Sequence, residues 1–226
     1  MRLAVLYQRL LEAYGPQGWW PAQDRFEVLV GAILTQNTAW LRVEQAIARL
    51  CGAGLMQPET MAACPTAELE RAIRPAGHFR VKAGYLKDFC YWFVACGGFA
   101  VLDTMETEAL RQELLGLRGI GPETADSMLL YAFGRPVFVV DAYTRRLLQR
   151  LGHGMESRLP YGALQAWLHE RLAADTAVYN EFHALIVTHG KAHCRTRPAC
   201  ADCALLQDCA GAARLPAGHG NPKTVN

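Results

Sequence analysis

The sequence predicts an all-α fold. Apolar residues recur at helical spacing along most of the 226-residue chain, and Gly and Pro interrupt the pattern at short intervals. No segment alternates apolar and polar residues as a half-buried strand would. Hydrophobic residues make up 51% of the chain and charged residues 19%, which indicates a globular protein with a sizeable core.

The predicted helices follow from this periodicity in chain order. Leu3, Leu6 and Leu10 mark a first helix, and Phe26 and Ile33 lie on one face of a second. Further helices are expected at 40–50, 67–74, 80–96, 106–115, 123–133, 142–151, 160–172 and 178–190. The stretch 211–226 holds several Gly and Pro and few apolar residues, which predicts a loose tail.

Composition limits the classes of protein. No apolar run reaches the ~18 residues that a membrane span requires, and the N-terminus lacks the apolar core and cleavage site of a signal peptide. We therefore expect a cytoplasmic, monomeric protein without a membrane partner. The net charge of +2 does not by itself indicate nucleic-acid binding. The 23 basic residues include four lysines, which limits the candidates for an amine nucleophile: Lys82, Lys87, Lys191 and Lys223.

The segment Leu117–Ala125, LRGIGPETA, places two glycines around one apolar residue between two helical patterns. Gly119 and Gly121 can adopt backbone angles closed to other residues and permit close approach of another backbone. Pro122 suits the first turn of the next helix, whose free N–H groups can bind a phosphate. Gly119, Ile120 and Gly121 are therefore candidate phosphate-binding residues. The alternative is a plain helix–helix turn.

Asp141 follows the apolar run Val137–Val140 and precedes a helical pattern. Asp at this position is a good N-cap, and capping alone would explain it. A carboxylate fixed at a helix N-terminus also stays ionised. It can then stabilise a positive charge that develops beside it, or orient a water molecule. The two roles are compatible.

Four cysteines near the C-terminus have the spacing C-x5-C-x2-C-x5-C: Cys194, Cys200, Cys203 and Cys209. Clustered cysteines in a cytosolic chain indicate a metal site rather than disulfides. Four thiolates in one short loop can bind a [4Fe–4S] cluster. Zinc is the alternative, although zinc ribbons ordinarily pair two C-x-x-C knuckles and one is present here.

Three tryptophans flank the predicted second helix, two before it and one after it. Trp19 and Trp20 are adjacent and precede Pro21, and Trp40 follows Thr38 by two residues. Two adjacent tryptophans cannot both point into one helix face, which predicts that one of them lines a surface or a pocket. The alternative is that all three anchor the core.

Several of these motifs together resemble the endonuclease III superfamily of helix-hairpin-helix DNA glycosylases. The similarity runs over roughly residues 19–209 and includes the hairpin, the segment Ala132–Pro136, Asp141 and the four cysteines. It implies two helical lobes: 23–133 as a helical barrel with the hairpin, and 1–22 with 134–226 as the iron–sulfur domain. It also implies a structural [4Fe–4S] cluster, whose usual first gap is one residue longer, and Asp141 as the catalytic carboxylate.

The resemblance carries expectations about DNA. Double-stranded DNA containing a damaged base would lie between the lobes. Gln36 matches the residue that fills the gap left by the extruded base, and His78 matches the wedge residue. Family members that also nick DNA carry a lysine where this chain has Glu123. Because a carboxylate cannot form a Schiff base, this implies a monofunctional glycosylase that uses water. Glu123 is then either a second pocket carboxylate or a favourable first-turn residue.

The 3-methyladenine DNA glycosylases of that group resemble this chain further. They share Trp-Trp-Pro before the second helix, an aromatic residue two positions after Gln-Asn-Thr, and Glu in place of the hairpin lysine. The implied pocket would hold an alkylated purine with its cationic ring between the faces of Trp20 and Trp40; its residues are Trp19, Trp20, Pro21, Trp40 and Lys191. Some members lack the cysteines. The alternatives are a glycosylase for uracil, mismatched or oxidised bases, and a non-catalytic DNA-binding iron–sulfur module.

Overall fold

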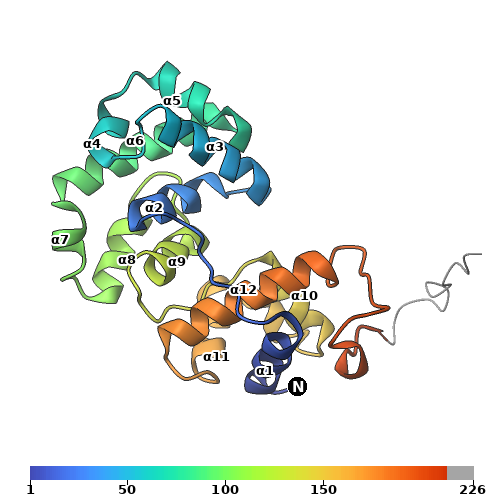
Figure 1. The fold of residues 1–226 in the computed structure, drawn as a ribbon. Helices are drawn as coiled ribbons and strands as arrows, with labels where there is room; N and C mark the ends of the chain where they lie inside the picture. The colour runs from blue at the N-terminus through green and yellow to red at the C-terminus, as the bar shows by residue number, and fades with distance from the viewer. Residues whose placement is uncertain (213–226) are drawn as a thin grey trace, which may run out of the picture. The chain divides into compact units, whose positions relative to one another are not determined.

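The structure, a computed structural model, describes residues 1–212. The prediction of an all-α fold is confirmed, because these residues form helices and no strand (Figure 1). Within the same residues no helix has both the length and the apolar character to cross a membrane. Most of the expected tail, 213–226, lies outside the described residues. The chain divides into two compact units, 20–137 and 1–19 with the chain from 138 onward.

The first unit, residues 20–137, is called the hairpin unit because it contains the 117–125 segment. Its helices are α2 Arg25–Leu34, α3 Trp40–Gly52, α4 Pro58–Ala63, α5 Thr66–Ala72, η1 Arg74–Ala76, α6 Phe79–Ala95, α7 Gly98–Leu102, α8 Thr107–Leu115 and α9 Pro122–Tyr131. The second, called the cysteine unit, has α1 Leu3–Tyr14, α10 Ala142–Arg150, η2 Glu156–Arg158, α11 Tyr161–His169, α12 Thr176–Ala192 and η3 Leu206–Asp208.

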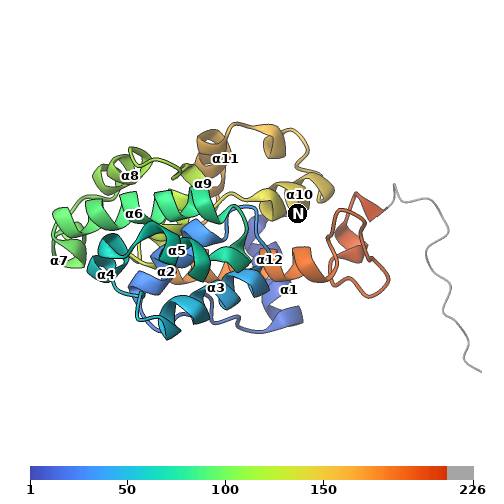
Figure 2. The same ribbon diagram turned by 90° about the horizontal axis from the view of Figure 1, so that it is seen from above.

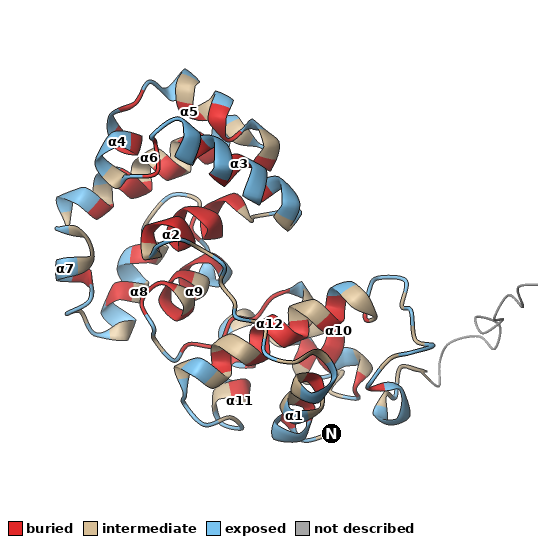
Figure 3. Cartoon of the chain, in the orientation of Figure 1, coloured by how far each residue is buried: buried red, intermediate tan, exposed pale blue. Residues whose placement is uncertain are grey.

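Helix α2 forms the centre of the hairpin unit. Nine of its ten residues are buried, from Phe26 to Leu34, and it packs against α3, α6 and α9. A helix that is apolar on nearly all sides must be covered on all sides. Figure 3 shows this contrast, with α2 mostly buried and α3 exposing one face. The end of α2, where Gln36 follows, is therefore fixed by the core.

Helix α12 has the same role in the cysteine unit. It packs against α1 and α10 (Figures 1 and 2). Phe138 lies beside two aromatic residues of α12, with ring centroids 5.4 Å from Tyr179 and 5.8 Å from Phe182. The extended segment that leads to Asp141 is therefore buried: Phe138, Val139 and Val140 are each at most 2% exposed.

The structure differs from the sequence prediction at two short helices and at the unit boundaries. Helices α4 and α7 have six and five residues, too few for a periodic pattern. The boundaries lie at 19/20 and 137/138 instead of 22/23 and 133/134. Trp20 packs on Gly31 within the hairpin unit, and Val137 joins that unit's core while Phe138 joins α12.

Candidate active site and cysteine loop

Asp141 is the N-cap of α10. Its Oδ1 accepts a hydrogen bond from the backbone N–H of Thr144 over 2.7 Å, and the residue is 8% exposed. The buried segment before it delivers the carboxylate to the helix N-terminus, where the partial positive charge of the helix favours an anion. The predicted cap is present, and it occupies one of the two carboxylate oxygens.

The other oxygen faces His183 of α12. His183 Nε2 lies 3.6 Å from Asp141 Oδ2, and both side chains are almost buried, at 10% and 11% exposed. Burial alone would raise the pKa of Asp141, but the neighbouring His183 and the Thr144 N–H outweigh it and hold that pKa below its ordinary value of 3.8. The site therefore presents an ionised carboxylate at neutral pH.

The hairpin joins α8 to α9. Gly119 has φ +83°, and a Cβ at this position would collide with the ring of Tyr85 on α6, so the position requires glycine. Gly121 differs from the prediction, because its φ is −93°, which any residue adopts, and a Cβ there would meet open space. Ile120 is 5% exposed and donates its N–H to Leu117 O, so its side chain belongs to the core.

Glu123 lies in the first turn of α9 and is exposed to solvent. This helix begins without a side-chain cap, in contrast to α10. The buried acidic residue of α9 is Asp126, which is fully buried and pairs with Arg111 through Nε at 2.7 Å. The structure thus separates a structural carboxylate, Asp126, from an accessible one, Glu123, on a single helix.

The aromatic residues of the hairpin unit contact each other directly. The rings of Trp20 and Trp40 meet edge to face with centroids 5.2 Å apart, and Trp20 makes a similar contact with Tyr131 at 5.4 Å. This spacing leaves no room for a third ring between Trp20 and Trp40, so the expected stacking of a base between them is wrong. Pro21 is exposed, and Trp40 Nε1 donates to Glu44.

Trp19 and Lys191 belong to the cysteine unit. The Lys191 ammonium lies 6.0 Å from the centroid of the Trp19 ring, within reach of a cation–π contact. The expected pocket residues therefore form two sets. One contains Trp20, Pro21 and Trp40 in the hairpin unit, and the other contains Trp19 and Lys191.

Gln36 and His78 lie on two loops of the hairpin unit. Gln36 follows α2 and its Nε2 donates to Gly119 O over 2.8 Å and to Thr124 Oγ1 over 3.0 Å. His78 precedes α6, is exposed, and has φ +45°. In the described part of the chain the residues other than glycine with positive φ are His78 and Asn37, the neighbour of Gln36.

The four cysteines Cys194, Cys200, Cys203 and Cys209 line one cavity of about 300 Å³. Burial raises the pKa of the Cys200 and Cys203 thiols. Arg150 of α10 donates from Nη1 to Cys194 Sγ at 3.1 Å and to Arg195 O at 2.7 Å. Across residues 1–212, no three His, Cys, Asp or Glu side chains are grouped so that they could hold a metal ion.

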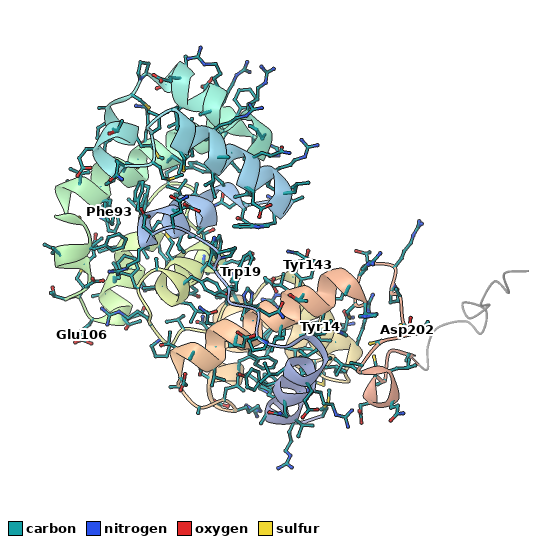
Figure 4. All side chains as sticks on the ribbon, in the orientation of Figure 1. Tyr14, Trp19, Phe93, Glu106, Tyr143 and Asp202 are labelled. Atoms are coloured by element: carbon teal, nitrogen blue, oxygen red, sulfur yellow. The ribbon has the colours of Figure 1, made fainter. Side chains whose placement is uncertain are left out.

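His189 of α12 links this cavity to α1. It is 1% exposed, its Nδ1 is 2.8 Å from the hydroxyl of Tyr14, and its Nε2 is 3.9 Å from Cys203 Sγ. Figure 4 labels Tyr14. Burial, aided by His193, lowers the pKa of His189 to about 4. A neutral imidazole is therefore buried beside the cysteine loop.

Residues 30–164 match the family model described as HhH-GPD superfamily base excision DNA repair protein. The chain belongs to the HhH-GPD superfamily. It is 43% identical over 208 residues to a protein of Methanocaldococcus jannaschii provisionally named as a DNA repair glycosylase, covering 90% of this chain and 94% of that one.

Solved structures of the superfamily are similar along most of the chain. The 3-methyladenine DNA glycosylase of H. pylori bound to 1,N6-ethenoadenine has a TM-score of 0.71 and 27% identity, covering 84% of this chain and 98% of that chain. An endonuclease III in a non-covalent DNA complex has a TM-score of 0.78 and 23% identity, covering 94% and 95%. At this identity, the similarity to endonuclease III shows a shared fold and nothing more.

Sequence reasoning about this HhH-GPD chain did not predict the buried positions of three polar residues. His183 and His189 lie on the buried side of α12, and Lys82 lies on the buried side of α6. A signal exists in the sequence for each, because an ionisable residue stands at a helical position otherwise occupied by apolar residues. Which partner each one meets depends on segments far away along the chain.

Proposed function

We propose that this chain is a monofunctional DNA glycosylase that hydrolyses the N-glycosidic bond of a damaged base in double-stranded DNA. The observation that carries the proposal is the buried Asp141 carboxylate, which is held at the N-terminus of α10 with a lowered pKa. Membership in the HhH-GPD superfamily supports the reaction class.

The chemistry assigned to Asp141 is electrostatic. As the bond between sugar and base breaks, the sugar becomes positively charged, and an ionised carboxylate in a nearly dry site stabilises it more strongly than water does. The Thr144 N–H fixes one oxygen, and His183 orients the other. The same carboxylate can accept a hydrogen bond from the attacking water.

The environments of the lysines support water as the nucleophile. Lys82 is 2% exposed and donates to three acceptors. Lys87 donates to the carbonyls of Ala62 and Cys64. Lys191 lies beside Trp19, and Lys223 lies outside the described residues. With Glu123 in the hairpin helix, Lys191 is the amine to test for Schiff-base formation.

The proposed substrate is an alkylated purine, with 3-methyladenine as the leading example. A cationic base gains attraction on an electron-rich aromatic face, and Trp20 and Trp40 are each only partly buried. Because these rings contact each other, the base would stack on an outer face of the pair. The likeness to the H. pylori 3-methyladenine enzyme supports this substrate class.

We also propose a [4Fe–4S] cluster held by the four cysteines. The cavity they line is about 300 Å³, which accommodates a group larger than a single ion. Zinc is the alternative, although zinc ribbons ordinarily pair two C-x-x-C knuckles and this loop has one. Four thiolates in one short loop suit an iron–sulfur cluster. When bound, it cross-links the loop, and the Arg150 guanidinium supplies a hydrogen bond to Cys194.

Release of bases from a panel of lesion duplexes tests the substrate and the reaction. We expect faster release of 3-methyladenine than of uracil or oxidised pyrimidines, and an intact abasic strand. Faster release of uracil or of a mismatched base would overturn the substrate assignment and leave the glycosylase assignment standing. No release from any duplex that the protein binds would favour a non-catalytic DNA-binding module.

Borohydride treatment during turnover tests the nucleophile. A monofunctional enzyme forms no Schiff base, so we expect no covalent adduct with DNA. Trapping at the level of a bifunctional enzyme would contradict the proposal, and Lys191→Ala then shows whether Lys191 is the amine.

Iron and acid-labile sulfide analysis of anaerobically purified protein tests the cluster. We expect both elements together with broad visible absorbance from iron–sulfur thiolates. Zinc without iron would overturn the assignment.

A further inference from the structure

Lys82 is a buried lysine whose ammonium bonds only to uncharged oxygen atoms. It is 2% exposed on the inner side of α6, and its Nζ donates to Leu34 O at 2.8 Å, Thr38 Oγ1 at 2.7 Å and Ala76 O at 3.0 Å. An ammonium has three hydrogens, so these three bonds use its full donor capacity. Because Lys82 is buried, contact with solvent does not explain a lysine in this position.

The three acceptors belong to two separate loops. Leu34 and Thr38 bound the turn that follows α2, and Ala76 closes η1 just before α6. Thr38 Oγ1 also donates to Ala76 O over 2.6 Å, so the hydroxyl, the ammonium and the carbonyl form one network. Lys82 therefore ties the 34–38 loop to the 74–78 loop.

Both loops are held in an uncommon backbone conformation. Asn37 has φ +52° and His78 has φ +45°. Such residues cost free energy and persist where the surroundings fix them. Each lies within two residues of an oxygen that Lys82 or Thr38 engages, and Gln36 lies between two of these acceptors. The network thus fixes the backbone on which Gln36 and His78 stand.

Holding the network has a measurable cost. Burial lowers the pKa of Lys82 to about 8, because an ammonium loses hydration when it is buried. An apolar side chain here would avoid that cost but would leave the carbonyls of Leu34 and Ala76 without this donor. The lysine therefore satisfies acceptors on both loops at once.

We propose that Lys82 is a positioning residue for base extrusion: it fixes the 34–38 and 74–78 loops to each other so that Gln36 and His78 enter the duplex together. The inference rests on the proposed function and on the expectation, implied by the resemblance to the glycosylase family, that these two side chains enter the duplex. Extruding a base from a paired stack costs a few kcal/mol, and less when the base is unpaired. A loosened pair of loops should therefore fail most on a fully paired target.

The test compares one lesion in two settings, a fully paired duplex and a single-nucleotide bulge, by single-turnover excision at saturating protein. For Lys82→Met we expect the rate on the paired substrate to fall about tenfold more than the rate on the bulge. The fluorescence of 2-aminopurine placed beside the lesion should show slower unstacking. Thr38→Val, a milder variant, should show the same selectivity with a smaller loss.

Lys87→Met is the matched control. Lys87 is also on α6 and donates to two backbone carbonyls, Ala62 O at 2.7 Å and Cys64 O at 2.5 Å, but these lie at the C-terminal end of α4. Its loss should change both substrates equally. Equal losses on both substrates for Lys82→Met and Thr38→Val, scaling with a lowered melting temperature, would overturn the positioning role.

Gln36→Ala and His78→Ala distinguish a failure of the Lys82 proposal from a failure of the insertion role on which it depends. If both lose activity selectively on the paired substrate while Lys82→Met and Thr38→Val do not, the positioning role of Lys82 is wrong and the proposed insertion stands. If neither shows the selective loss, the proposed insertion is wrong, and the inference about Lys82 falls with it.

Discussion

Helices α10 and α9 each begin next to an acidic residue, and these two carboxylates have opposite surroundings. At α10 the acid is the N-cap, Asp141, which is 8% exposed and bonded to Thr144 N. At α9 it is a first-turn residue, Glu123, which is exposed on a helix with no side-chain cap. Both lie at the positive end of a helix dipole.

The difference shows that burial, rather than position on a helix, separates a carboxylate fit for chemistry from a favourable surface charge. Electrostatic stabilisation is strong where water is excluded and weak where solvent screens it. Asp141 also has a fixed neighbour in His183, so its second oxygen has a defined orientation. The comparison predicts that Asp141 matters more for catalysis than Glu123. Substitutions at the two residues test this prediction.

The largest effect is expected for Asp141→Asn. The amide keeps the N-cap but removes the negative charge that the proposed function assigns to stabilising the sugar in the transition state. Single-turnover excision should fall by at least about a hundredfold, a loss typical of removing one electrostatic stabiliser. DNA affinity and melting temperature should change little. Excision assays, binding measurements and thermal unfolding on the same preparation check this.

Asp175→Asn is the matched control, because Asp175 caps α12 through Val178 N at 3.0 Å and is exposed. It should leave excision unchanged. Near-native turnover by Asp141→Asn would show that Asp141 is a cap and nothing more.

The next largest effect is expected for His183→Gln. Burial is the largest influence on Asp141 and raises its pKa, and His183 is the main opposing group. Without His183 the pKa of Asp141 should rise. Excision near neutral pH should fall about tenfold through lost orientation, and the acid side of the pH–rate profile should move to higher pH. Single-turnover rates from about pH 5 to 8 measure both.

The same substitution has a consequence for stability. The folded-state pKa of Asp141 is depressed below 3.8, so its contribution to stability is present above that value and is lost as the pH falls through the folded pKa. In His183→Gln the folded pKa rises, and acid unfolding should begin at higher pH. His153→Gln, which alters a histidine bonded to Met1 O, should not shift it. Identical acid midpoints for all three proteins would refute the pairing of His183 with Asp141.

The fold could be predicted from sequence where the periodic pattern is long. The expected helices at 40–50 and 142–151 correspond to α3 and α10, because three turns of apolar residues on one face define a helix and Gly or Pro marks its end. Helices α4 and α7 were missed because one or two turns carry no period. Gly119 was assigned its special backbone conformation correctly, whereas Gly121 needs none.

The site could be predicted as far as local chemistry determines it. Asp141 as an N-cap follows from its neighbours in sequence. Its contact with His183, 42 positions away, does not, and neither does the network of Lys82, whose acceptors include two backbone carbonyls. The edge-to-face contact of Trp20 with Trp40 also depends on tertiary packing, since Trp20 seats on Gly31. The sequence pattern identifies candidate residues, whereas tertiary packing determines which groups they contact.

The smallest effect is expected for Glu123→Gln. Its side chain is exposed, so solvent screens its charge from any reacting group, and the substitution should change single-turnover excision by no more than about threefold. Asp126→Asn on the same helix provides the contrast: Asp126 is fully buried and paired with Arg111, so this variant should lower the melting temperature. A loss with Glu123→Gln as large as that with Asp141→Asn, at unchanged melting temperature, would mean that DNA binding buries Glu123. Both carboxylates would then serve the reaction, and burial in the free protein would not be what distinguishes them.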